Sequence, residues 1–406
     1  MSKLAELPTA TSMSLSLDFI GMGEALTYSF TPITVSESSN PWFKELGAAP
    51  SLNDRGTIAF WVYYQDSSKA LYTANNGSRN LLADRTSSGA KFFLVAGDPI
   101  INNQDTVAVY GELERGGEAI LTFNGESFTP IADSKTSFFC FPSSVAINDN
   151  GTVVFVAELD TGNRGIFKSN GGYTKQIAEL PAKDYFSIYD PMITRVAINN
   201  PGTVAFTYWE FVDFLPGYSA LYINDSIDPI ADNIDKFDRF TNLAINDEGK
   251  VVFCADLASG NEGIFLYDGN EIIEIANNNE GSYFQDFSLS NPAINNQGTV
   301  AFFAEQSFSD DNSYQGIFTG SNPETDKVIA VGDDLLGSKV KKLSFSGKGL
   351  NNLGQIAFYA ELENGTKGFF LANPRLKSIS EPVSVFSLLT MVADGLNVKR
   401  SQGNII

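Results

Sequence analysis

One eight-residue pattern returns seven times along this chain, and its spacing restricts the fold more than any other feature. Asn opens every copy, Ile or Val holds the sixth position, Gly stands fourth in six copies and Phe closes six. In the second copy Asp105 replaces the Gly and Val109 replaces the Phe. The copies begin at Asn53, Asn102, Asn148, Asn199, Asn246, Asn295 and Asn351. A period near 50 residues built from short β segments predicts a propeller or a solenoid.

Each copy has the pattern of a β-hairpin. β-rich segments flank the four residues Asn-x-x-Gly, as in Asn148 to Gly151. The Asn side chain can fold onto its own backbone as an Asx-turn, and Gly supplies the positive φ that closes the connection. We therefore predict that the seven Asn residues are structural turn residues.

Two further recurring sequence patterns follow the hairpin, and each is expected to form a strand. They complete a unit of four strands, which is the size of a propeller blade. The last unit lacks its fourth strand, whereas residues 26–36 read as a lone strand with no blade of its own. We predict an all-β, seven-bladed β-propeller over 26–372, closed by this N-terminal strand; an open solenoid is the alternative. The blades are expected at 42–85, 91–134, 138–181, 185–233, 237–278, 284–333, and 341–372 joined with 26–36.

Composition excludes several functions. The net charge of −21 argues against nucleic acid as a partner, because phosphate binding needs basic residues. The chain has no histidine, which removes Ser-His-Asp and Cys-His catalysis and histidine-bearing zinc sites. Its two cysteines, Cys140 and Cys254, fall in separate repeats, so both are expected to be buried thiols and not a disulfide.

Acidic residues recur ten positions after the repeat Asn, on one face of the second strand. In a closed ring they would form a partial circle able to bind a cation or glycan hydroxyls. The alternative is that each carboxylate caps a loop or bonds to a neighbouring blade. These residues are Glu112, Glu158, Asp256, Glu305 and Glu361.

Aromatic residues supply a second candidate site. Pairs such as Phe138-Phe139 recur between units and are expected to pack between blades, because aromatic side chains bury large areas. The fourth unit departs from the period with an enlarged loop, and such departures are where binding is often added. Its aromatic residues, candidates for stacking on a sugar ring, are Trp209, Phe211, Phe214 and Tyr218.

No cofactor is expected. The segments Asp310-Asp311-Asn312 and Asp333-Asp334 have the oxygen ligands that Ca²⁺ prefers, but neither has a loop spacing that requires it. Solvated turns are the simpler interpretation, and Ca²⁺ remains the one candidate ion.

The repeats resemble the NxxGxxAF tandem-repeat family, whose bacterial members are exported and carry varied C-terminal anchors. Ala-Phe closes four copies, for example Ala59-Phe60, and Val-Phe closes two. The strand order is also similar to TolB-type propeller repeats, in which the strand before the turn is innermost. The resemblance implies the fold and export, and it implies no activity.

Both ends fit export. Residues 1–25 resemble a signal peptide with a small-x-small site at Gly23-Glu24-Ala25; a plain tail is the alternative. In the tail 373–406, Glu381-Pro382, an apolar stretch and Lys399-Arg400 resemble a PEP-CTERM sorting segment. The alternative is an amphipathic helix, since the apolar stretch is too short to span a bilayer. We expect a periplasmic, cell-surface or secreted protein that meets a membrane only through this segment.

The sequence therefore predicts an exported, non-catalytic binding or surface-structural module that recognises a glycan or extracellular polysaccharide, or a surface protein. Two alternatives remain open. One is a carbohydrate-active enzyme with paired carboxylates, a chemistry that needs no histidine. The other is a protein-docking scaffold, which only the fold suggests.

Overall fold

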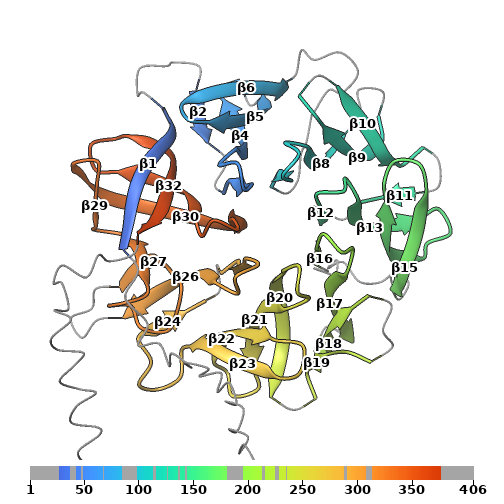
Figure 1. The fold of residues 1–406 in the computed structure, drawn as a ribbon. Helices are drawn as coiled ribbons and strands as arrows, with labels where there is room; N and C mark the ends of the chain where they lie inside the picture. The colour runs from blue at the N-terminus through green and yellow to red at the C-terminus, as the bar shows by residue number, and fades with distance from the viewer. Residues whose placement is uncertain are drawn as a thin grey trace, which may run out of the picture. The chain divides into compact units, whose positions relative to one another are not determined.

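Seven β-sheets surround a common axis and form a closed ring (Figure 1). Every regular element among the described residues is a β-strand, which confirms the predicted seven-bladed propeller. The signal-peptide and sorting-segment predictions fall outside the described residues. The computed structural model describes residues 27–375 except 37–42, 47–48, 67, 85–97, 113–115, 126, 136–137, 142–143, 181–194, 213–214, 225–227, 235, 288–289 and 308–312.

The described strands of the first three blades lie within the predicted boundaries. In blades 1 and 3 the first strand is split in two, and both pieces pair with the second strand. Blade 1 comprises β2 (Phe43–Leu46), β3 (Ser51–Leu52), β4 (Ile58–Tyr64), β5 (Lys69–Asn75) and β6 (Ser78–Ala83). Blade 2 comprises β7 (Ile100–Ile101), β8 (Val107–Glu112), β9 (Glu118–Phe123) and β10 (Phe128–Asp133). Blade 3 comprises β11 (Phe138–Cys140), β12 (Val145–Ile147), β13 (Val153–Leu159), β14 (Arg164–Ser169) and β15 (Thr174–Leu180).

The next three blades repeat this plan. Blade 4 comprises β16 (Val196–Ile198), β17 (Val204–Val212), β18 (Leu215–Ile223) and β19 (Ala231–Asp232). Blade 5 comprises β20 (Phe237–Ile245), β21 (Val251–Leu257), β22 (Glu262–Tyr267) and β23 (Ile272–Asn277). Blade 6 comprises β24 (Phe284–Asp286), β25 (Ala293–Ile294), β26 (Val300–Ser307), β27 (Ser313–Phe318) and β28 (Lys327–Ala330).

Blade 7 joins the two ends of the described chain. Its strand order is β1-β32-β31-β30-β29, and the short β29 forms a hairpin with the beginning of β30. The last strand continues to Arg375, three residues beyond the predicted end of the propeller. The strands are β1 (Thr27–Ser36), β29 (Asp334–Leu335), β30 (Ser338–Leu350), β31 (Ile356–Leu362) and β32 (Lys367–Arg375).

The N-terminal strand closes the ring as predicted. β1 runs antiparallel to β32, so the beginning of the chain supplies the outermost strand of the last sheet (Figure 1). Their register shifts between Pro32 and Thr34, and a proline is tolerated there because β1 is an edge strand. Ile33 is only 4% exposed and joins a cluster that contains Phe60 of blade 1 and Phe369 of blade 7. The clasp therefore also packs blade 7 against blade 1.

Phenylalanine fills the spaces between sheets. In blade 5, Phe237, Phe240, Phe253 and Phe265 form a cluster with ring centroids 5.1 to 5.7 Å apart. Blades 3 and 6 repeat this cluster at equivalent positions. In the two adjacent aromatic pairs between units that the structure describes, strand alternation leaves one residue in solvent: Phe139 is 65% exposed and Tyr283 is 54% exposed. These two pairs thus supply one packing residue each, Phe138 and Phe284.

Candidate functional site

The repeat Asn residues form a closed circle of hydrogen bonds around the axis. Each side-chain Nδ2 donates to the main-chain oxygen of the next repeat Asn at 2.9 to 3.2 Å, and Asn351 completes the circle by donating to Asn53. Each Oδ1 also accepts backbone N–H groups of its own turn. Asn102 accepts from Gln104 at 3.0 Å and from Thr106 at 2.9 Å. The Asn residues therefore cap their turns, as predicted, and also join neighbouring blades, which was not predicted.

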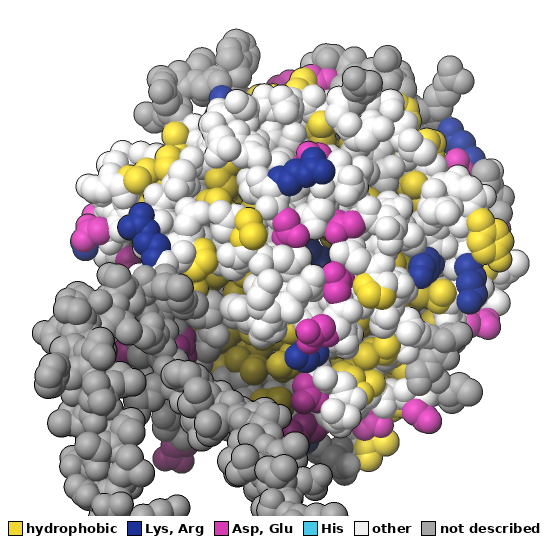
Figure 2. All heavy atoms as spheres, in the orientation of Figure 1, with side chains coloured by type: hydrophobic (Ala, Val, Ile, Leu, Met, Phe, Trp, Pro, Cys, Tyr) yellow, Lys and Arg dark blue, Asp and Glu magenta, His cyan; other side chains and the backbone are white. Residues whose placement is uncertain are grey.

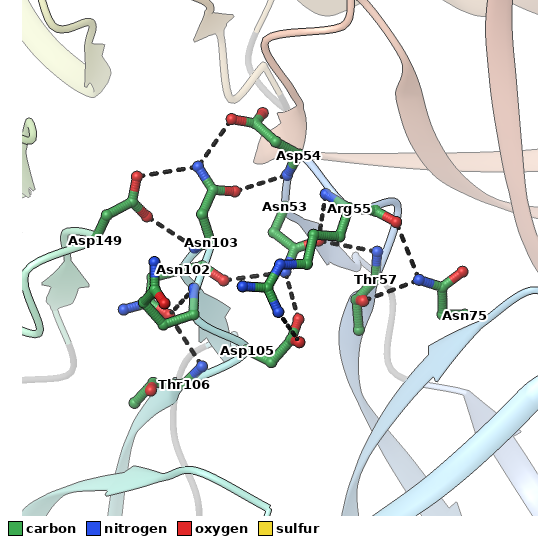
Figure 3. A network of polar contacts seen from close by, with 11 residues as sticks. Asn53, Asp54, Arg55, Thr57, Asn75, Asn102, Asn103, Asp105, Thr106 and Asp149 are labelled. Atoms are coloured by element: carbon green, nitrogen blue, oxygen red, sulfur yellow. Dashed lines mark hydrogen bonds and ion pairs between the residues drawn. The ribbon is translucent and has the colours of Figure 1, made fainter.

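A second circle is formed by the residue after each repeat Asn. Its backbone N–H donates to a side-chain oxygen of the equivalent residue in the next blade, at 2.7 to 2.9 Å. Aspartate and asparagine alternate from Asp54 to Asn296, and a second asparagine, Asn352, completes the circle. Asparagine amides therefore bond to the carboxylates; Asn103 donates to both Asp54 and Asp149 (Figure 3). We call this circle the polar mouth: Asp54, Asn103, Asp149, Asn200, Asp247, Asn296 and Asn352. The polar mouth was not predicted, although an Asp or Asn follows every repeat Asn in the sequence.

The one departure from the repeat glycine has a structural reason. Asp105 adopts a positive φ of 59°, which Asp tolerates better than most residues. Its Oδ1 accepts from Asn53 Nδ2 at 2.7 Å and its Oδ2 from Arg55 at 2.8 Å (Figure 3). The substitution thus keeps the backbone shape of glycine and adds two contacts with blade 1.

A polar space lies on the axis beyond the mouth. Branched aliphatic residues, such as Ile101 and Ile198, precede each repeat Asn and line the axis next to the Asn circle. Next to these aliphatic residues, on the side away from the Asn circle, lies a cavity that we call the axial chamber. Its volume is about 260 Å³. Its charged lining residues are Asp98 of blade 2, Arg195 of blade 4 and Lys348 of blade 7. Lys348 also borders the cavity at the polar mouth.

Enclosure changes the ionisation of the chamber groups. Burial lowers the pKa of Lys348 to about 8 and also lowers the pKa of Arg195. Asp98 is exposed to the channel. The protein around it nevertheless removes water from its carboxyl and so raises its pKa, an effect that Arg195 partly offsets. Figure 2 shows acidic side chains around the centre of one face and a basic side chain deeper between them.

Most predicted ring acids form ion pairs within their own blades. Glu158 pairs with Arg164 at 2.9 Å, and that Arg side chain is only 2% exposed. Asp256 pairs with Arg239 at 2.6 Å. The pKa of Asp256 is nevertheless raised by burial, because the desolvation exceeds the opposing effect of Arg239. These two carboxylates belong to separate sheets and act locally.

The other three acids do not complete a shared site. Glu361 binds Lys341 at 3.0 Å and Lys367 at 3.4 Å, and the Lys341 contact foremost lowers its pKa. Glu305 lies on β26 opposite Gln315. Glu112 ends β8 opposite Glu118, and its side chain is outside the described part of the structure. The arrangement favours the local interpretation of these acids, and a role in ligand binding stays a prediction.

The non-repeating aromatic segment of blade 4 is a long hairpin and not the enlarged loop that we expected. Phe211 pairs with Pro216, so β17 and β18 continue almost to the turn. Trp209 also lies on β17, whereas Phe214 is outside the described residues. Tyr218 packs beside Tyr208 with ring centroids 6.1 Å apart. Tyr218 is therefore part of blade packing rather than an open platform for a sugar.

A different aromatic residue borders a surface cavity between blades 3 and 4. We call this cavity, of about 330 Å³, the outer groove. Tyr173, 73% exposed, stands at the β14–β15 turn on its edge. The groove lies at the Val204 end of β17, opposite the predicted Trp209 end. Its other polar lining residues are Thr152, Lys168, Ser169, Asn170, Lys175 and Asn224.

No metal centre is evident in the part of the chain that the structure describes, where no three acidic or cysteine side chains gather. Asp333 and Asp334 bind Lys327 and Lys339, both at 2.9 Å, and Asp310 to Asn312 lie outside the described residues. Both cysteines are free thiols. Cys254 is buried as expected, with its pKa raised to about 12 by burial, whereas Cys140 is only half-buried.

Solved structures similar to this chain are β-propellers at low sequence identity. The propeller domain of the trilobed protease from Pyrococcus furiosus is 12% identical with a TM-score of 0.48, and the match covers 85% of this chain and 99% of that one. A polysaccharide lyase, described as an ulvan lyase, is 10% identical with a TM-score of 0.45 and coverages of 86% and 99%. TolB from Acinetobacter baumannii is 11% identical with a TM-score of 0.39; the match covers 69% of this chain and 62% of TolB. These are likenesses of fold alone.

Three further observations concern membrane-spanning helices and related sequences. Among the described residues no helix is long and apolar enough to cross a membrane. No curated protein matches the sequence. One family model matches residues 124–346 and again 229–385, which together make up more than half of the chain. The chain therefore belongs to the family described as a family of unknown function, DUF7453.

Proposed function

We propose that this protein is an exported, non-catalytic propeller that binds a glycan in the outer groove. The observation that carries the proposal is the position of Tyr173, an exposed ring beside a cavity rich in hydroxyl and amide groups. An aromatic face with nearby hydrogen-bonding groups suits the apolar face and the hydroxyls of a sugar.

The groove also contains fixed and available donors. Lys168 donates to the main-chain oxygen of Gly202 at 2.8 Å, which links blade 3 to blade 4 and fixes one wall. Lys175 lines the same cavity and makes no ion pair with another described residue. Its ammonium is therefore available to sugar hydroxyls or to one acidic substituent. Because the whole chain carries −21, we expect a neutral or sparsely charged glycan rather than a densely anionic one.

Local ion pairing supports a non-catalytic role. A glycosidase needs two carboxyl groups roughly 5–10 Å apart across one sugar-binding cleft. Glu158, Asp256 and Glu361 each bind basic side chains in different blades, and the residues lining the outer groove include no carboxylate. Binding without bond cleavage is the function that these contacts favour.

A glycan array tests the proposal. The full chain is applied with and without Ca²⁺, and each hit is titrated against Tyr173→Ala and Lys175→Ala. We expect roughly tenfold weaker binding for Tyr173→Ala, the size of a lost aromatic anchor. Tyr283→Ala is the matched control, because Tyr283 is a 54% exposed tyrosine in another blade. Binding that survives Tyr173→Ala unchanged contradicts the groove assignment.

The same samples separate binding from catalysis. Each bound polysaccharide is incubated with the protein, and new reducing ends or unsaturated products are measured. A steady release of either product would support the enzyme alternative and contradict a purely binding role.

Export rests on the sequence of the two ends, residues 1–25 and 373–406. We expect fractionation of cells of the source organism to place the protein outside the cytoplasm, with a mature N-terminus near Ala25. Intact protein confined to the cytoplasm would contradict export and leave the groove test unaffected.

A further inference from the structure

The axial chamber is built from residues that stand four positions before the repeat Asn, where the units differ in chemistry. The equivalent residue is Asp98 in blade 2, Arg195 in blade 4 and Gly347 in blade 7, where the next residue is Lys348. In the other blades that line the chamber, this position is Ser144, Asn242 or Asn291. Three charged groups thus converge on one cavity from three directions around the ring.

The chamber has the opposite charge to the rest of the molecule. Arg195 and Lys348 contribute two positive charges and Asp98 one negative charge, which leaves an excess of one positive charge in a protein of net charge −21. A cation withdrawn from water is costly unless an anion accompanies it. In a chain this acidic, a cavity lined without regard to a ligand would be expected to contain mainly acidic groups. The excess of basic groups in the chamber therefore points to an anionic ligand.

Both cations are available to a ligand. Arg195 Nε donates to Asn242 Oδ1 at 3.0 Å, which fixes the plane of the guanidinium. Among the described residues, the terminal nitrogens of Arg195 and the Nζ of Lys348 have no hydrogen-bond or ion-pair partner. The amide of Asn242 is itself held by the main-chain oxygen of Ser290 at 2.9 Å. The guanidinium is therefore positioned in advance, and its two outer donors suit a carboxylate.

The two ends of the axis differ in their charge. The polar mouth holds the carboxylates Asp54, Asp149 and Asp247, which repel an approaching anion. Their oxygens are occupied by amide donors of neighbouring blades. An anion is consequently expected to enter the chamber from the end away from the polar mouth.

We propose that the axial chamber binds one small hydroxycarboxylate, with its carboxylate between Arg195 and Lys348 and a hydroxyl donating to Asp98. The single excess positive charge matches one carboxylate, and the volume of about 260 Å³ limits the ligand to a small molecule. This site is separate from the outer groove and does not depend on the glycan proposal.

Calorimetric titration of the full chain in chloride-free buffer at pH 7 tests the site with three probes of similar size. Lactate has both groups, propionate lacks the hydroxyl, and lactamide lacks the charge. We expect lactate to bind most tightly, propionate several-fold more weakly, and lactamide not at all. Arg195→Gln and Lys348→Met are each expected to weaken lactate binding by tenfold or more. Lys339→Met, which removes an exposed lysine from the same blade as Lys348, should leave binding unchanged.

Circular dichroism of each variant separates a binding defect from a folding defect. The proposal is overturned if folded wild-type protein fails to bind lactate, or if lactamide or propionate binds as well as lactate. Lactate binding that persists in both Arg195→Gln and Lys348→Met also overturns it. Lys348 faces Arg195 and Asp98 in the chamber and Asp54, Asp149 and Asp247 at the polar mouth. Affinity should further fall as the pH rises through about 8, where Lys348 loses its proton.

Discussion

The side-chain amide of Asn351 donates to the main-chain oxygen of Asn53 at 3.1 Å, although the two residues are 298 positions apart. This bond makes the circle of repeat Asn residues continuous across the joint between the last blade and the first. Both side chains are nearly buried, at 4% and 3% exposed. The repeat Asn is thus a joint between blades as well as a turn cap.

Replacing a repeat Asn should destabilise the ring. Asn102→Ala removes the acceptor of two turn N–H groups and the donor to Asn148, and so leaves buried polar groups unsatisfied. We expect the free energy of unfolding to fall by about 2–4 kcal/mol, measured by urea denaturation. Gln104→Ala is the control, because Gln104 is exposed in the same turn. Equal losses in the two variants would contradict the structural role of the Asn.

Asp105 should respond differently to glycine, asparagine and alanine. Asparagine and glycine tolerate its positive φ, whereas alanine does not, and both alanine and glycine lose the contacts with Asn53 and Arg55. Thermal denaturation should therefore rank stability as Asn above Gly above Ala, with Asp105→Ala lower than wild type by about 1–3 kcal/mol. A Gly variant less stable than the Ala variant would contradict this explanation.

The ion pair in blade 3 should be far more sensitive than one at the surface. Arg164→Ala leaves the Glu158 carboxylate largely buried without its partner, and we expect a loss of about 3–5 kcal/mol in unfolding free energy. Lys339→Ala breaks the exposed pair with Asp334 and should cost no more than about 1 kcal/mol. Chemical denaturation of both variants measures the contrast, and similar losses would contradict the assigned burial.

The ionisation of Lys348 should appear in the pH dependence of stability. Its pKa is about 8 in the folded chain and 10.5 ordinarily, so between these values the unfolded chain holds a proton that the folded chain has released. Stability contributed by this group therefore rises with pH across that window. Relative to Lys348→Met, wild type should gain about 1–2 kcal/mol from pH 7 to pH 10.5, since water in the channel screens part of the effect. A difference that stays constant with pH would contradict the lowered pKa.

The fold could be predicted because its determinants repeat. Ring closure could be predicted because the last repeat lacks a fourth strand and the N-terminal segment has a strand without a blade. In the structure β1 pairs with β32. Cys140 is half-buried, whereas the sequence predicts a buried thiol. The periodicity indicates which face of a strand a residue occupies, but not how deeply that residue lies within its blade. The sequence predicts a loop at Phe211 because the usual turn signals are spread along that segment, whereas the structure forms a hairpin there.

The candidate sites were harder to predict because they depend on residues that depart from the repeat. Tyr173 stands in a turn whose counterparts in blades 1, 2 and 5 carry no aromatic residue, and its groove exists only where blade 4 lies beside blade 3. The chamber charges Asp98, Arg195 and Lys348 come from three blades at or next to one repeat position, but the residue type at that position changes from blade to blade. Their meeting on the axis requires the ring to be closed first.

Closure of the ring by the N-terminal strand is tested most directly by native-state hydrogen exchange of the full chain. Peptides that cover β1 (Thr27–Ser36) and β32 (Lys367–Arg375) report the two partners of the joint. If β1 completes blade 7, the hydrogen-bonded amides of both strands are protected to a similar extent and open together. Rapid exchange throughout residues 27–36, with β32 still protected, would contradict a closed ring.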